Sequence, residues 1–171
     1  MELYFLRHGL AGQYGDPKYK DDSLRPLTAE GKRKMHQESL GMQVLGLKFD
    51  TILSSPYVRA RQTAEIIARS YELKNKDIHL TNNLLPPASI KDLLKEARLH
   101  FPRSEKILLV GHEPHLTEMV SCLLNCKVPL MINLKKGGLC SVTLPDDGDL
   151  RHAALNWLLT PQQLNFLKPD L

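Results

Sequence analysis

Two arginines and two histidines in this 171-residue sequence lie where they could bind an anion. Arg7 and His8 come directly after the first apolar run of the chain, and His112 follows a later apolar run. Arg59 lies in the first turn of a helix predicted after residues 54–56. Guanidinium groups and helix N-termini both donate hydrogen bonds to anions. The four residues therefore predict an anion site, for which phosphate is the most natural ligand.

Strands and helices are predicted to alternate along the chain and so to position these residues. Short apolar runs predict the strands, and apolar residues at helical spacing predict the helices. The predicted strands comprise residues 3–6, 51–53, 78–80, 106–110, 140–144 and 152–158, with a turn at 145–148 before the last. The predicted helices comprise residues 29–45, a segment that follows 54–56, and residues 89–99 and 114–124. This alternation predicts a three-layer α/β fold, with helices on both faces of a mostly parallel central sheet, in a single domain of residues 1–171.

The carboxyl ends of the predicted strands should bring the site together, because ligands bind at that edge of parallel sheets. Thr28 is predicted to cap the first helix. Four other histidines do not follow a strand to this edge and are expected to be structural: His36, His79, His100 and His152. His115 lies one helical turn after His112 and could be either a site residue or a structural residue.

Composition narrows the classes of function. Apolar residues make up 42% of the chain and charged residues 25%, which suffices to fold a core without a disulfide or a structural metal. The formal net charge of +4 suits an anionic substrate or nucleic acid, but aromatic residues are only 6% and are not interleaved with basic ones, which argues against nucleic acid. No apolar run approaches the about 18 residues of a membrane helix, and the N-terminus lacks the features of a signal peptide. A cytoplasmic protein without a membrane partner is therefore expected.

The three cysteines are an odd number without a C-x-x-C pair, which also fits a reducing compartment. Cys122 and Cys126 are four residues apart on a predicted helix, a spacing that could hold a metal if histidines flanked it. Their neighbours Val120, Leu123 and Leu124 are apolar, so buried and inert thiols are expected. No metal and no other cofactor is predicted.

Four motifs, in the order in which they occur, resemble those of the histidine phosphatase superfamily. They are Leu6-Arg7-His8-Gly9, Arg25-Pro26-Leu27-Thr28 with Gly31, Ser54-Ser55-Pro56-Tyr57-Val58-Arg59-Ala60-Arg61-Gln62-Thr63, and Val110-Gly111-His112-Glu113-Pro114. The short chain, the second motif and the late Lys135-Lys136-Gly137-Gly138 segment are similar to the SixA-type phosphohistidine phosphatases. The resemblance implies a phosphoglycerate mutase-like fold, a phosphorylated histidine intermediate and no metal.

The resemblance also implies a role for each site residue. His8 would be the nucleophile, and Arg7, Arg59 and His112 would share catalysis and phosphate binding with it, while Arg25 would bind phosphate as a neighbour. Arg59 and Arg61 are two residues apart on a helix, so their side chains point about 200° away from each other. Only one of these two can face the pocket, and Arg59 is expected to do so.

The leaving group points to the class of substrate. Larger superfamily members place a carboxylic acid after the middle of the chain to protonate an alkoxide, and residues 81–89 contain no Asp or Glu, although Glu113 and Asp16 are candidate substitutes. Phosphohistidine has a better leaving group than a phosphoester. The sequence therefore favours a phosphatase that acts on a phosphohistidine-bearing protein, such as a phosphotransfer domain. A small-molecule phosphomonoesterase or mutase on the same fold, and a non-enzymatic phosphate-binding or nucleic-acid-binding module, remain as alternatives.

A protein substrate is also suggested by the connections between elements. These are expected to be short apart from residues 9–23, which would leave the pocket open. The basic residues Arg25, Arg61, Lys135 and Lys136 could then meet an acidic surface of the partner around the pocket.

Overall fold

A six-stranded sheet is the centre of the computed structural model, which describes residues 1–73, 78–145 and 152–168. The strands are β1 (Glu2–Arg7), β2 (Thr51–Ser54), β3 (Ile78–Leu80), β4 (Lys106–Gly111), β5 (Leu139–Thr143) and β6 (Ala154–Leu159). Their order in the sheet is β3-β2-β4-β1-β5-β6. The expected turn at 145–148 lies outside the described residues apart from Pro145.

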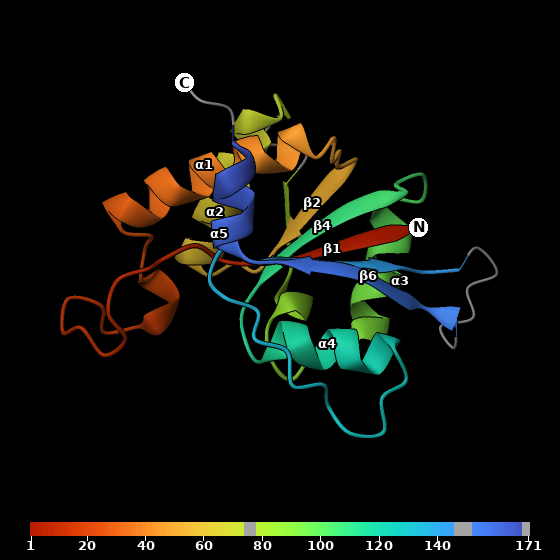
Figure 1. Ribbon diagram of the computed structural model, residues 1–171. Helices are drawn as coiled ribbons and strands as arrows, with labels where there is room; N and C mark the ends of the chain where they lie inside the picture. The colour runs from red at the N-terminus through yellow and green to blue at the C-terminus, as the bar shows by residue number, and fades with distance from the viewer. Residues whose placement is uncertain (74–77, 146–151, 169–171) are drawn as a thin grey trace.

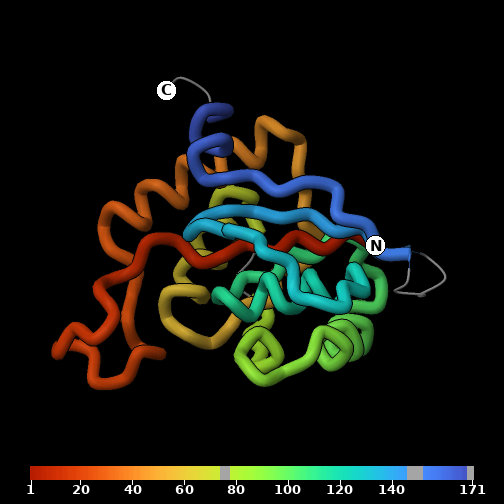
Figure 2. The backbone as a smooth tube through the Cα atoms, turned by 60° about the horizontal axis from the view of Figure 1, so that its bottom comes forward, coloured from red at the N-terminus to blue at the C-terminus, as the bar shows by residue number. Residues whose placement is uncertain are grey.

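The four strands β3, β2, β4 and β1 run parallel to one another, whereas β5 and β6 are antiparallel to their neighbours. Figure 2 shows β5 and β6 side by side with β1. Parallel neighbours need crossover connections, and helices between the strands provide them here. The predicted mostly parallel sheet is thus confirmed, with two antiparallel strands at one edge.

The helices cover both faces of the sheet, as predicted. They are α1 (Ala29–Val44), α2 (Val58–Ser70), α3 (Ile90–His100), α4 (His115–Leu123) and α5 (Pro161–Leu167). Figure 1 shows α3 and α4 on one side of the sheet and α1, α2 and α5 on the other. None of the described helices is both long enough and apolar enough to span a membrane.

Two hydrophobic cores lie on the two faces of the sheet, because side chains alternate along each strand. In β1, Leu3 and Phe5 belong to the core that contains the apolar residues of α3 and α4. Tyr4 and Leu6 belong to the core that contains those of α1, α2 and α5. This division fixes which side chains of β1 face each layer, and the pairing of β1 with β4 and β5 fixes its direction and register.

Three features differ from the sequence expectations. Helix α5 was not predicted; Thr160 caps it through a capping box with Gln163. The connection between α4 and β5, residues 124–138, is long rather than short. Cys122 is exposed rather than buried, because it lies on the outer face of α4, and Cys126 is partly exposed after the helix end.

The first turn of α1 packs tightly on the segment that follows β1. The side chain of Thr28 accepts a hydrogen bond from the N–H of Gly31 at 2.9 Å, which confirms the predicted cap. The N–H of Thr28 in turn donates to the carbonyl of Leu10 at 3.0 Å. A Cβ atom at Gly31 would lie 1.9 Å from that same carbonyl oxygen. Gly31 therefore permits the close approach that holds the segment after His8 against α1.

We expect Gly31→Ala to lower the free energy of unfolding by about 1–3 kcal/mol, because the methyl group would overlap backbone atoms of Leu10 that cannot move alone. Helix propensity acts in the opposite direction, since alanine favours a helix over glycine by about 1 kcal/mol. Urea unfolding of the variant measures the difference, with Lys32→Ala at the exposed neighbouring position as control. An increase in stability for Gly31→Ala would show that the close approach is not tight.

Candidate active site

His8 lies immediately after β1 and is 5% exposed. Its backbone N–H donates to the carbonyl of Gly111 at the end of β4. Its Nδ1 atom lies 2.7 Å from the carbonyl oxygen of Gly9, which can only accept, so Nδ1 carries the proton. The lone pair of the ring is therefore on Nε2, and Nε of Arg59 lies 3.3 Å from that atom. The structure thus defines which nitrogen of His8 can bond to an electrophile.

Burial is the main reason that His8 is uncharged. The pKa of His8 is lowered to about 2, mainly by burial; the bond to Gly9 opposes this effect, and the nearby charges of Arg59 and Arg7 add to it. A neutral imidazole is the form that can act as a nucleophile. His8 is therefore in its reactive form throughout the physiological pH range.

Arg59 and Arg25 share one acidic neighbour, Asp22, which the sequence analysis did not single out. Arg59 donates to the carbonyl oxygen of Asp22 at 2.7 Å and to its carboxylate at 2.8 Å. Arg25 donates to the other carboxylate oxygen at 2.8 Å and to the carbonyl of Gly12. Burial alone would raise the pKa of Asp22, but the two arginines hold it below its usual value. Asp22 thus keeps two guanidinium groups together.

Arg7 is the last residue of β1, and its guanidinium group donates to the carbonyl oxygen of Leu134 at 2.9 Å. Its Nε atom is buried and has no hydrogen-bond partner among the described residues. Lys136 lies close enough to this cluster for the charges of Arg7, Arg25 and Arg59 to lower its pKa, in addition to the larger effect of burial. Lys136 was expected on a surface that meets the partner protein. The order of the motifs does not indicate that it lies near the arginines.

His112 is beside His8, with the two ring centroids 5.1 Å apart. Its Nε2 atom lies 2.8 Å from the hydroxyl of Ser55, while its Nδ1 atom is buried without a partner among the described residues. The pKa of His112 is lowered to about 3, mainly by burial and in addition by the charge of Arg59. His112 is therefore also neutral, and Ser55 of the third motif orients it.

The remaining candidates from the sequence are Arg61, Asp16, Glu113 and His115. Arg61 is largely exposed and its Nε atom is 3.5 Å from Glu65, so it faces away from His8. Asp16 accepts a hydrogen bond from the backbone of Lys18 and has no contact with the cluster. Glu113 is near Arg7, and both of its carboxylate oxygens accept hydrogen bonds from Thr117. His115 is buried one turn beyond His112.

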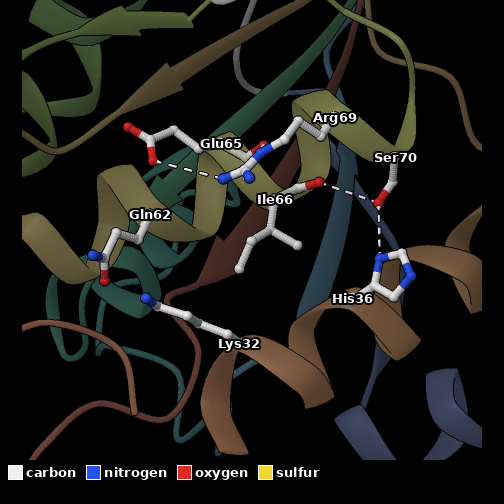
Figure 3. A pocket seen from close by; sticks show the side chains of 7 residues that line it. All are labelled: Lys32, His36, Gln62, Glu65, Ile66, Arg69 and Ser70. Atoms are coloured by element: carbon white, nitrogen blue, oxygen red, sulfur yellow. Dashed lines mark hydrogen bonds and ion pairs between the residues drawn. The ribbon is translucent and has the colours of Figure 1, made fainter. Parts of the chain in front are cut away.

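A cavity of about 460 Å³ between α1 and α2 lies apart from these residues (Figure 3). It is lined by Lys32, His36, Gln62, Glu65, Ile66, Arg69 and Ser70. None of the predicted site residues lines it, and within it the side chain of Ser70 bonds to the carbonyl of Ile66 and to His36. The cluster around His8 is therefore defined by the convergence of charged groups rather than by the volume of this cavity.

The fold and this cluster define an α/β protein with arginines gathered around a neutral histidine at the carboxyl edge of its sheet. The family model of the histidine phosphatase superfamily (branch 1) matches residues 3–84, which contain His8, Arg25 and Arg59. The chain belongs to the histidine phosphatase superfamily, and within it the chain is of the SixA type.

Relatives and solved structures cover nearly the whole chain. An uncharacterised protein of Picosynechococcus is 38% identical over 140 residues, 81% of this chain and 82% of the relative. The phosphohistidine phosphatase SixA of Escherichia coli K12 is 26% identical over 98% of this chain and 99% of its own length. The structure of the protein histidine phosphatase SixA complexed with tungstate has a TM-score of 0.79 at 24% identity and covers 96% of this chain and 99% of that chain.

The same fold also occurs in proteins named for small substrates. A putative α-ribazole-5'-P phosphatase of Escherichia coli has a TM-score of 0.67 at 17% identity, with coverage of 94% of this chain and 97% of that chain. The phosphoglycerate mutase-like fold is thus not confined to proteins named for phosphohistidine.

The two neutral histidines should make the protein less stable in acid. The pKa of His8 is about 2 and that of His112 about 3 in the folded protein, whereas a histidine in the unfolded chain titrates near about 6.5. Between these values only the unfolded state binds the protons, so the free energy of unfolding falls as the pH falls below about 6.5. The maximum slope is about 1.4 kcal/mol per pH unit for each histidine.

Urea unfolding at several pH values between about 5 and about 7.5 tests this linkage. Carboxylates also titrate in acid, so the decisive quantity is the difference between variants. We expect His112→Asn to reduce the slope, and the exposed His36→Ala to leave it unchanged. Equal slopes in the wild type and in His112→Asn would mean that His112 is not buried in its neutral form.

Proposed function

We propose that this protein is a phosphohistidine phosphatase, which removes phosphate from a phosphohistidine-bearing protein through a covalent phospho-His8 intermediate. The observation that carries the proposal is the state of His8. Its Nδ1 is held by the carbonyl of Gly9, its Nε2 carries the lone pair, and the guanidinium group of Arg59 lies beside that atom. A nucleophile with positive donors around it is what phosphoryl transfer requires.

The reaction has two displacements at phosphorus. In the first, the lone pair of His8 Nε2 forms a bond to phosphorus while the phosphorus–nitrogen bond of the substrate breaks, and the leaving imidazole keeps the electron pair and takes up a proton. In the second, water attacks phosphorus, the bond to His8 breaks, and inorganic phosphate leaves. Arg7, Arg59 and His112 stabilise the negative charge on the phosphoryl oxygens in both steps.

Arg25 and Lys136 extend the positive surface around these groups. Arg25 is 8% exposed and is tied to Arg59 through Asp22, so it supports the position of Arg59 and adds to the charge that attracts phosphate. Lys136 lines a cavity together with Gly9, the residue after His8, and burial and the charges of the arginines lower its pKa. We include Lys136 in the proposed phosphate site on these two grounds.

The environment of Glu113 supports a substrate whose leaving group needs little help. Burial raises the pKa of Glu113, but the hydroxyl and the backbone N–H of Thr117 both donate to its carboxylate, which stabilises the charged form. The pKa of Glu113 stays above its usual value, but Thr117 engages both of its carboxylate oxygens, which leaves neither free to reach a leaving group. Residues 81–89 offer no other carboxylic acid, so phosphohistidine is a more suitable substrate than an alkyl phosphate.

Replacement of His8 by alanine should abolish hydrolysis, because no other group is proposed to bond to phosphorus. A wild-type protein mixed with a labelled phosphohistidine protein and quenched in alkali should carry one acid-labile, alkali-stable phosphate on His8, detectable by mass spectrometry. Neither turnover nor labelling should change in His36→Ala or in the presence of a chelator. Full turnover in a folded His8→Ala protein would exclude the covalent mechanism.

The class of substrate can be tested at one pH with matched concentrations. We expect kcat/KM on a phosphohistidine protein to exceed that on 3-phosphoglycerate or a sugar phosphate by at least about 100-fold, the low end of what general acid catalysis contributes. The difference should narrow for aryl phosphates, whose leaving group needs little protonation. Equal or faster turnover of an alkyl phosphate would favour the alternative function, a small-molecule phosphatase or mutase.

A further inference from the structure

Two histidines and a glutamate converge at the edge of the sheet that is distant from β1. His79 is the middle residue of β3, the edge strand, and Glu96 and His100 lie near the end of α3. One nitrogen or oxygen atom from each of the three side chains lies within 4.8 Å of the others. Strands β2 and β4 separate β3 from β1, so this cluster is distinct from the phosphate site.

The backbone brings the three side chains together from two elements. Glu96 and His100 are four residues apart on α3, so they lie on the same face of the helix. His79 faces them from β3, with its Nε2 atom 2.7 Å from Oε1 of Glu96. The rings of His79 and His100 are 5.0 Å apart between centroids and are inclined by 32°. Two imidazoles and one carboxylate oxygen thus surround a common point.

Glu96 is held in a fixed orientation by two further residues. The hydroxyl of Thr81 donates to Oε2 of Glu96 at 2.5 Å, and the side-chain amide of Asn83 donates to the same oxygen at 2.7 Å. Both bonds engage Oε2 and leave Oε1 directed at His79. Hydrogen bonds of this kind, to the oxygen that does not bind the ion, are the usual support of carboxylate ligands in metal sites.

A structural pairing of β3 with α3 would explain only part of this arrangement. His79 and Glu96 alone form such a pair, with their side chains 28% and 19% exposed. His100 is exposed, and within the described residues its ring has aromatic neighbours, His79 and Phe101, but no hydrogen bond or ion pair. Its position beside the other two is what a third metal ligand would require.

We propose that His79, Glu96 and His100 bind a divalent transition-metal ion of the Zn²⁺ class. Two imidazole nitrogens favour such an ion over Mg²⁺ or Ca²⁺, which prefer oxygen ligands. Bond lengths to Zn²⁺ are about 2.0–2.2 Å, so the donor atoms must move closer together than 4.8 Å, which rotation of the exposed His100 side chain allows. Water completes the tetrahedral coordination. The ion would join α3 to the three-residue edge strand β3.

Titration of the metal-free, full-length protein with Zn²⁺ in a calorimeter, and with Co²⁺ by absorption spectroscopy, tests the site. We expect one ion per chain in the wild type and a visible Co²⁺ spectrum of tetrahedral type. His100→Ala and Glu96→Gln should weaken the affinity at least about 100-fold, and Thr81→Ala should weaken it by about 10-fold, because Thr81 only orients Glu96. Saturating Zn²⁺ should raise the melting temperature of the wild type but not that of His100→Ala.

The control variants distinguish this site from other histidines. His36→Ala, at an exposed histidine on α1, and His8→Ala, in the phosphate site, should both bind Zn²⁺ with unchanged affinity and stoichiometry. His100 is exposed, so His100→Ala should fold normally, and its circular dichroism spectrum verifies this. Unchanged Zn²⁺ affinity in His100→Ala, loss of binding in His8→Ala, or an absence of binding at millimolar Zn²⁺ would each overturn the proposal.

Discussion

An uncharged imidazole in contact with the guanidinium group of Arg59, away from water, is the arrangement on which the proposed phosphate site depends. Burial of His8 disfavours its charged form, and the nearby arginines disfavour it further. The same positive charges attract a phosphate group, so the residues that would bind the substrate also keep the nucleophile reactive. Burial also disfavours the charged form of Arg59 and lowers its pKa. Asp22 counteracts this effect, because Arg59 donates hydrogen bonds to its carboxylate and to its backbone carbonyl.

Helix α2 holds this arrangement to the rest of the fold. The hydroxyl of Thr63 accepts a hydrogen bond from the N–H of Gly9 and donates to the carbonyl of Arg59. The side chain of Gln62 accepts a bond from the N–H of Leu27. One turn of α2 therefore fixes both the segment after β1 and the segment before α1. The sequence motif that carries Arg59 is dense in polar residues because several of them connect separate segments around the phosphate site.

The sequence predicted most of the framework because apolar runs define strands, and polar residues that follow parallel strands must meet at one edge. Helix α5 escaped prediction because it has seven residues and buries only Leu164, too little for a helical apolar pattern. Asp22 escaped because it lies in a polar connection with no periodicity, where an acidic residue near Arg25 is unremarkable. The cluster at Glu96 escaped for a related reason: His79 lies within a strand rather than after it, and only the packing of α3 on the edge strand brings it to His100.

The way in which Glu113 is held at the start of α4 bears on which leaving groups the proposed reaction could use. Thr117 lies one turn after Glu113 and donates two hydrogen bonds to its carboxylate, an arrangement that also satisfies a backbone N–H in the first turn of the helix. These two bonds therefore use Glu113 to hold the start of α4. Burial raises the pKa of Glu113, but both of its oxygens are engaged by Thr117, so neither is free to protonate an alkoxide. Substrates with a nitrogen leaving group avoid that requirement, because imidazole accepts a proton from water near neutral pH. Under the proposed function, the packing of one helix terminus would thus limit the chemistry of the adjacent phosphate site.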